Sequence, residues 1–397
     1  MLFNVNELLI SLSLTLDFAE KDVLPNYTSH GIRAAYVAGR VARELGMPDE
    51  PLFDLVSYSL LHDNGVLGAL RKSAGAGKPA ETAMEANPEH CVEGEKNIRT
   101  FPFLSPQKGV ILYHHEHFDG SGAFGLSGNE IPLYSRIIAM ADAIAVLYAK
   151  GLNSDEILEA LRRDARLFDP DVRKAVEKLG GRVEFWLGMG NMFVKSSLLS
   201  MLPKVSRELN YRQIRSISRI FSRIIDAKSP FTGSHSRGIS ERVGEICRYY
   251  EFDEKTYWMM RIAADLHDLG KLAVPNGILD KPAKLTRQEF MTIQSHPYYT
   301  RKILENIKGF EEITEWASNH HEKLDGSGYP YGLDRSRLDF NSRILACVDI
   351  YQALTEDRPY RKALSHAEAM KLMQGMARDG LIEPSVTEDM GTIFRNG

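Results

Sequence analysis

Apolar residues recur along most of this chain at the positions that line one face of an α-helix. Six runs show the i, i+3, i+4 and i+7 spacing clearly: 32–45, 52–62, 153–167, 214–227, 240–250 and 256–266. Prolines stand between the periodic runs, where a missing N–H and a fixed φ angle interrupt helices: Pro48, Pro88, Pro102, Pro203, Pro297 and Pro384. Ser365 and Glu368 have the spacing of a helix capping box. Because convincing strand patterns are absent, the sequence predicts an all-α fold.

Histidine and aspartate residues interrupt the apolar runs in the same order twice. His30 lies 32 residues before His62, and His235 lies 32 residues before His267. The first set is His30, His62, Asp63, His90, His114, His115 and Asp142, and the second is His235, His267, Asp268, His296, His320, His321 and Asp349. A length of 397 residues also agrees with two domains. We therefore expect a duplicated domain: residues 1–180, an apolar inter-repeat segment 181–204, and residues 205–397.

Composition limits the class of protein. Hydrophobic residues make up 43% and charged residues 26% of the chain, and its net charge is −4. These values are typical of soluble globular proteins and argue against a DNA-binding or membrane-binding chain. The three cysteines, Cys91, Cys247 and Cys347, are isolated, which fits a reducing compartment and excludes a thiolate zinc site. With no apolar run long enough to span a bilayer and no basic stretch at the start, we expect a cytoplasmic protein without a transmembrane segment.

The segment 181–204 is rich in glycine, methionine and aromatic residues. Phe185, Trp186, Met189 and Phe193 lie in its most apolar part. This composition does not suit a solvated linker. We expect its burial between the repeats, while pairing of two protomers into a homodimer stays open.

The second set of polar residues offers seven nitrogen and oxygen ligands and no thiolate. Seven ligands are sufficient for two metal ions that share a carboxylate. Imidazole and carboxylate favour transition metals over magnesium or calcium, so we expect iron or manganese, with nickel, cobalt or zinc as alternatives. Such a site holds a bridging hydroxide and polarises a phosphoryl oxygen, which makes phosphodiester hydrolysis its natural reaction. Lys271 follows Asp268 by about one helical turn and can present its ammonium to the same phosphate.

Three stretches of the second repeat resemble the HD-GYP domain. They are the segment 267–271 (HDLGK), the segment 320–330 (HHEKLDGSGYP) and the segment 349–361, which begins DIYQALT and ends RPYR. The resemblance spans about residues 210–397. It implies a helical HD bundle and a metal-dependent phosphodiesterase that opens bacterial cyclic dinucleotides. Its typical substrate is cyclic di-GMP, which it converts to linear pGpG and in some members to GMP.

The resemblance also assigns roles to individual residues. His235, His267, Asp268 and Asp349 resemble the ligands of the first metal. Asp268 as a bridge, with His296, His320 and His321, resembles the ligand set of the second. Lys271, Tyr329, Arg358 and Arg361 match residues that meet the substrate, and Phe231 stands where some members place a glutamate for a third metal. The resemblance thus implies a dinuclear catalytic site in which Asp268 and Lys271 are central.

The first repeat keeps its seven ligands but lacks the other features of the motif. Val66 replaces Lys271, and Gly122-Ala123-Phe124 replaces the Gly-Tyr-Pro triplet. The segment after Asp142 carries no arginine pair. Without those cations the charge of a cyclic dinucleotide would be poorly compensated. We interpret repeat one as a degenerate HD-like domain with a regulatory or structural role, in which a second metal site is possible. A weak or different phosphohydrolase and a relic with empty ligand positions are the alternatives.

Two other functions compete with cyclic di-GMP hydrolysis. One is hydrolysis of 3',3'-cyclic GMP-AMP, because nothing in these motifs determines base preference. The other is a non-catalytic sensor that binds the dinucleotide or a metal and signals through a protein partner. The intact Lys271, Tyr329 and seven ligands favour an enzyme.

Overall fold

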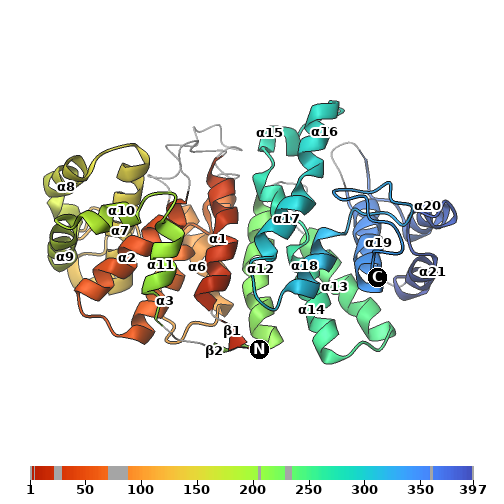
Figure 1. Ribbon diagram of the computed structural model, residues 1–397, viewed down its shortest axis with the longest axis horizontal. Helices are drawn as coiled ribbons and strands as arrows, with labels where there is room; N and C mark the ends of the chain where they lie inside the picture. The colour runs from red at the N-terminus through yellow and green to blue at the C-terminus, as the bar shows by residue number, and fades with distance from the viewer. Residues whose placement is uncertain are drawn as a thin grey trace. The chain divides into compact units, whose positions relative to one another are not determined.

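The computed structural model describes residues 2–3, 5–21, 29–69, 88–203, 207–228, 235–357 and 361–395. This part of the chain is helical, which confirms the predicted all-α fold. The strands within it are two residues long: β1 (Leu2–Phe3) pairs antiparallel with β2 (Arg207–Glu208). The chain divides into two compact units, 2–208 and 209–397, each of which contains one set of histidines and aspartates (Figure 1). The predicted roles of the two units remain proposals.

The N-terminal unit is built around one central helix, α2 (His30–Glu44), which packs against α3, α7, α9 and α11. Twelve of its residues are buried, among them Ala34, Ala35 and Ala38, because small side chains allow neighbours to approach from several sides. The other helices of this unit are α1 (Val5–Lys21), α3 (Asp49–Leu60), α6 (Glu89–Asn97), α7 (Leu133–Ala149), α8 (Ser154–Arg163), α9 (Pro170–Gly180), α10 (Val183–Gly188) and α11 (Val194–Met201). Three short 3-10 helices complete it: η1 (Ile98–Thr100), η2 (Gly128–Glu130) and η3 (Ala165–Leu167).

The C-terminal unit places α14 (Glu254–Leu266) in contact with four other helices: α12 (Tyr211–Lys228), α13 (His235–Tyr249), α18 (Glu311–Ser318) and α19 (Phe340–Thr355). The remaining elements are η4 (Leu269–Ala273), α15 (Asn276–Leu279), α16 (Arg287–Gln294), α17 (His296–Leu304), α20 (His366–Arg378) and α21 (Pro384–Ile393). In Figure 1, α20 and α21 lie beside α19. The capping box expected from Ser365 and Glu368 begins α20. These contacts place the ends of α14 and α18 near the middle of α19.

The apolar segment 181–204 folds as part of the N-terminal unit. Phe185 and Met189 are fully buried, and the Phe185 ring stacks on Tyr36 of α2 with centroids 6.0 Å apart. Arg33, also on α2, donates from Nε to the Met189 carbonyl at 3.1 Å. Met192 is nonetheless 84% exposed. The buried half of the segment is therefore explained by packing on α2, and the predicted homodimer stays a prediction.

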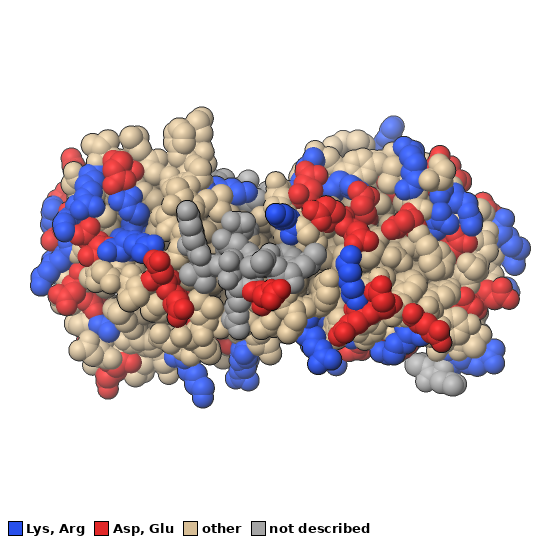
Figure 2. Space-filling view, turned by 60° about the horizontal axis from the view of Figure 1, so that its bottom comes forward, with Lys and Arg blue, Asp and Glu red and all other residues tan. Residues whose placement is uncertain are grey.

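Charges of both signs are interspersed over the described surface seen in Figure 2. This mixture agrees with the small net charge of −4. In the part of the chain that the structure describes, no helix combines the length and the apolar character needed to cross a bilayer.

Candidate metal centres

The second set of candidate ligands gathers where four helices begin, end or pass. His267 caps the C-terminus of α14 and Asp268 follows it, His296 begins α17, and His320 follows α18. All four of these side chains are at most 1% exposed. Asp349, from the middle of α19, is 6% exposed. Burying so many polar side chains together is costly unless they share a partner.

Backbone carbonyls fix the orientation of three of these imidazoles. The Nδ1 atoms of His267, His296 and His320 lie 2.8, 2.8 and 2.7 Å from the carbonyl oxygen three residues earlier in the chain. An Nδ1–H bonded in this way leaves Nε2 with its lone pair available. This arrangement is the usual support for a metal-binding histidine.

The Nε2 atoms converge on two carboxylates. Those of His267 and His296 lie 3.2 and 3.3 Å from the two oxygens of Asp268, and that of His320 lies 3.8 Å from the same carboxylate. Asp349 lies 3.8 Å from both His267 and His321. Asp268 thus occupies the centre of the cluster, as expected for a bridging carboxylate.

The charge of the cluster is set by its surroundings. Burial raises the pKa of Asp268, but His267 and Lys271 outweigh burial and hold that pKa well below its usual range. Burial, with His296 and Lys271 adding to it, lowers the pKa of His321 to about 3 against the opposing effect of Asp349. An ionised carboxylate next to neutral imidazoles is the donor set that a transition metal requires.

Lys271 lies in η4, one turn beyond the His-Asp pair. Its Nζ donates to Asp268 Oδ2 at 2.7 Å, and its side chain is 16% exposed. Tyr329 packs its ring against His321, with centroids 4.8 Å apart. Arg361 donates to the Ala353 carbonyl of α19. The side chain of His235, and the whole of Arg358 and Phe231, lie outside the described residues, so their predicted roles stay predictions.

One glutamate in each repeat was missed by the sequence analysis. Glu322 is buried and accepts hydrogen bonds from the N–H groups of Tyr331 and Leu333 at 2.7 and 2.9 Å. Glu116 binds Phe124 and Leu126 in the same way, at 2.8 Å each. The signal was present in the sequence, since a glutamate follows the His-His pair both times. These carboxylates hold the loop that carries Tyr329 in one repeat and Ala123 in the other.

The ligands of repeat one also meet. His30 Nε2 lies 3.0 Å from Asp142 Oδ1, and His62 Nε2 lies 3.1 Å from Asp63 Oδ2. The Nε2 atoms of His90 and His114 lie 3.9 and 3.8 Å from the other oxygen of Asp63. The remaining ligand, His115, belongs to a group with Asp63, His90 and His114 whose donor atoms lie within 4.8 Å of one another.

The residues of repeat one fit a metal. His62 and His114 direct Nδ1 to the carbonyls of Ser59 and Ile111 at 2.8 and 2.6 Å. The Nε2 atoms of these two histidines are buried and face the Asp63 carboxylate at 3.1 and 3.8 Å; an Nδ1–H that binds a carbonyl leaves Nε2 with a lone pair, which a carboxylate oxygen does not satisfy. A buried imidazole nitrogen without a partner is costly, and a metal ion would satisfy it.

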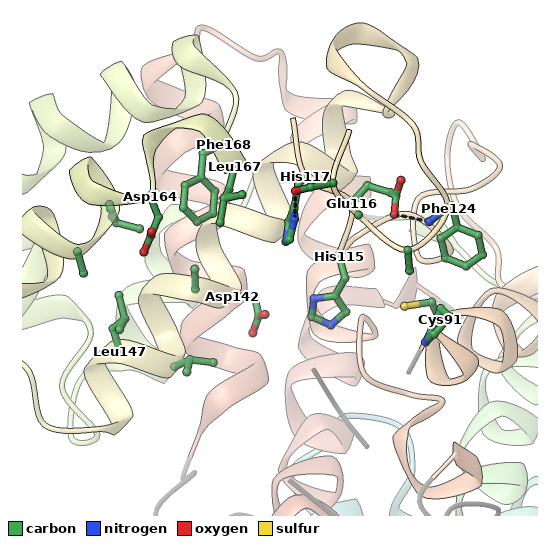
Figure 3. Close-up of a pocket in the computed structure, with 18 of the residues that line it drawn as sticks. Cys91, His115, Glu116, His117, Phe124, Asp142, Leu147, Asp164, Leu167 and Phe168 are labelled. Carbon is green, nitrogen blue, oxygen red and sulfur yellow. Dashed lines mark hydrogen bonds between the residues drawn. The ribbon is translucent and has the colours of Figure 1, made fainter. Parts of the chain in front are cut away.

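A cavity of about 650 Å³ adjoins the repeat-one cluster. Figure 3 shows His115 and Asp142 between two walls, one with Leu147 and Phe168 and the other with Phe124. Cys91 also lines it, with Sγ 3.4 Å from His90 Nε2. His117, a loop residue, also lines this cavity, and its Nδ1 lies 2.8 Å from Ser121 Oγ.

Comparison with known proteins agrees with this duplicated geometry. The model of the HD domain matches residues 18–172 and 219–386. The chain belongs to the HD-domain family. The predicted resemblance to HD-GYP proteins, with a tandem arrangement, is confirmed.

Three known proteins illustrate what this HD-domain chain is similar to. 3'3'-cGAMP-specific phosphodiesterase 1 of Vibrio cholerae is 30% identical over 382 residues, which cover 93% of this chain and 87% of that protein. A cyclic di-GMP phosphodiesterase of Pseudomonas aeruginosa is 35% identical over 36% of this chain and 35% of its own length. The crystal structure of a cyclic GMP-AMP-specific phosphodiesterase of V. cholerae has a TM-score of 0.66 and 26% identity, and the match covers 100% of this chain and 98% of that one.

Proposed function

We propose that repeat two hydrolyses a phosphodiester bond of a bacterial cyclic dinucleotide. The observation that carries this proposal is the convergence of three buried imidazole Nε2 atoms on Asp268, with the Lys271 ammonium 2.7 Å away on the same carboxylate. The relatives that match this chain are named as phosphodiesterases of cyclic dinucleotides, which supports the same reaction.

The side chains of repeat two divide this work between them. His267, Asp268, His296, His320, His321 and Asp349 would hold two divalent metal ions, with His235 as the remaining ligand expected from the sequence. The bound ions would supply an activated water and polarise a phosphoryl oxygen. The Lys271 ammonium stands where negative charge develops on the phosphate, and a fixed cation there stabilises the transition state. The Tyr329 ring forms a wall over His321 and limits the space for the sugar or base.

The substrate has two candidates. The sequence analysis put cyclic di-GMP first and cyclic GMP-AMP second. The relatives aligned over nearly the whole chain are specific for cyclic GMP-AMP, whereas the cyclic di-GMP phosphodiesterase named above matches 36% of this chain. We therefore put 3',3'-cyclic GMP-AMP first, with cyclic di-GMP as the second substrate, and a linear dinucleotide as the product of either.

Repeat one would support this reaction and not perform it. Val66 is buried where repeat two has Lys271, and Ala123 stands where repeat two has Tyr329. Without a counterpart of Lys271 at position 66, repeat one lacks the fixed charge that this lysine would offer a transferring phosphoryl group in repeat two. We assign it a regulatory role with its own metal site.

The test is product analysis with the full chain, loaded without oxygen with Fe(II) or Mn(II), on both cyclic substrates. Asp268→Asn and Asp63→Asn remove one central carboxylate each and keep its size. We expect turnover that is lost in Asp268→Asn and detectable in Asp63→Asn. Binding of substrate by metal-loaded protein without any cleavage would contradict the enzyme and restore the sensor hypothesis.

A further inference from the structure

The repeat-one cavity has the place of the substrate site in repeat two but a different shape. In repeat two the Tyr329 ring lies 4.8 Å from the His321 ring, centroid to centroid. The matching residue of repeat one is Ala123, an exposed residue on the rim of the cavity. The space that an aromatic ring occupies over the second histidine of the pair is therefore open over His115.

The cavity is also poor in positive charge. Among the described residues that line it, Arg163 is the one arginine and none is a lysine. The Arg163 side chain is 74% exposed and lies 3.8 Å from Asp164, which already offsets its charge. Glu116 also lines the cavity, and its carboxylate accepts hydrogen bonds from the backbone N–H groups of Phe124 and Leu126. A ligand with two phosphates would find too few cations here, because buried anionic groups need fixed positive partners.

The walls instead offer apolar surface on both sides. Leu147 of α7 and Phe168 line one side, and Phe124 lines the other. Val146 of α7 and Leu161 of α8 also line the cavity. Transfer of an apolar group from water into such a space is favourable, and it requires no directional contact. The cavity, at about 650 Å³, has the size of a small-molecule site.

The floor of the cavity can attract an acid. His90, His115 and Asp142 line it and belong to the ligand cluster. The donor atoms form two groups that share Asp63, one with His30 and His62 and the other with His90, His114 and His115. With a divalent ion in each group, the carboxylates of Asp63 and Asp142 would leave the cluster with a positive charge. That charge can accept one acidic group from the ligand.

We propose that repeat one binds a small monoanionic acid: a carboxylate that meets the metal cluster, on an apolar body that fills the cavity between Phe124 and Phe168. This inference does not depend on hydrolysis by repeat two. It gives the regulatory repeat a ligand class that differs from the cyclic dinucleotide in both charge and polarity.

The test uses 4-fluorophenylacetate as the probe and the full chain loaded with Mn(II). Manganese accelerates the relaxation of the fluorine signal when the probe binds beside it, so the readout is binding and not catalysis. We use the Asp268→Asn protein, in which the central carboxylate of the repeat-two cluster is removed. We expect strong relaxation with the acid and little with 4-fluorophenylacetamide, which lacks the charge.

Two further variants locate the probe. Ala123→Tyr gives repeat one the ring that repeat two has, and it should abolish the relaxation while the manganese content stays the same. Leu133→Tyr, at an exposed residue outside the cavity lining, should leave the relaxation unchanged. Asp63→Asn should lower both the manganese content and the relaxation. Relaxation that survives Ala123→Tyr, equal binding of the amide, or a manganese content unaffected by Asp63→Asn would each overturn the proposal.

Discussion

The Glu322 carboxylate accepts a hydrogen bond from the backbone N–H of Tyr331 at 2.7 Å, and this bond closes the loop that carries Tyr329. A second bond, from Leu333 at 2.9 Å, uses the other carboxylate oxygen. Gly328 packs so closely on Glu322 that a Cβ there would lie 2.5 Å from its Cα. The loop position is therefore determined by one buried carboxylate and one glycine.

Glu322→Ala should loosen this loop. Two partly buried N–H groups would lose their acceptor, at a cost of at most about 1–3 kcal/mol each. We expect a lower melting temperature and a raised KM for the cyclic dinucleotide, because Tyr329 is no longer held against His321. Glu116→Ala is the matched control in repeat one, and it should lower stability without raising KM. An unchanged KM in Glu322→Ala would show that the loop does not position substrate.

Lys271→Ala should reduce turnover and leave metal content intact. Loss of a fixed charge that stabilises a transition state typically costs about 10²–10³ in kcat. Lys271→Arg should recover part of the rate, since it restores the charge with a different shape. Steady-state kinetics, with metal analysis of each variant, check this. Equal kcat values in wild type and Lys271→Ala would remove Lys271 from the mechanism.

Gly270→Ala should disrupt the repeat-two cluster. A Cβ at this position would lie 2.0 Å from the carbonyl oxygen of His296, so α17 would have to move. We expect a loss of about 1–3 kcal/mol in stability and a lower metal content. Gly277→Ala is the control, because a Cβ there meets nothing within 4 Å. Thermal unfolding and metal analysis should show lower stability and lower metal content in Gly270→Ala but not in Gly277→Ala.

Glu383→Ala should destabilise the C-terminal unit without touching the cluster. Glu383 is 5% exposed and accepts from Arg335 at 3.1 Å and from Arg343 at 2.9 Å. The Arg335 side chain is 56% exposed, so its ion pair contributes little, whereas Arg343 is 17% exposed and would lose a charged acceptor. We expect a loss of about 1.5–3 kcal/mol, as for hydrogen bonds to charged groups. Denaturant unfolding measures the loss. An unchanged metal content in the folded variant would separate this structural role from that of Asp349.

Chelation of the bound metal should also lower stability. The clusters bring several buried imidazoles and carboxylates together, and a ligand that binds the folded state alone stabilises it by about 2.7 kcal/mol at one hundred times its Kd. We expect a lower melting temperature in the metal-free chain, restored by Mn(II). Asp63→Asn and Asp268→Asn should each show a smaller rise in melting temperature on addition of Mn(II), because each variant disables one of the two clusters. A melting temperature indifferent to metal would contradict both sites.

The sequence by itself determined the duplication, the helical fold and the candidate ligand set. Each of these is a matter of residue type and spacing: apolar positions at helical intervals predict helices, and His62-Asp63 and His267-Asp268 recur in one register. The sequence also shows that repeat one lacks counterparts of Lys271 and Tyr329, since Val66 and Ala123 stand at the matching positions. Such features do not require knowledge of how distant segments pack.

Only the tertiary structure decided which groups meet and what surrounds them. The central position of Asp268 depends on where α14, α17 and α18 end, and Glu322 became important only when its oxygens were found on the N–H groups of a loop nine and eleven residues away. The cavity over His115 likewise required the positions of α7, α8 and the 122–124 loop. Distances, burial and cavities are products of packing between segments far apart in the chain, and spacing along one sequence does not encode them residue by residue.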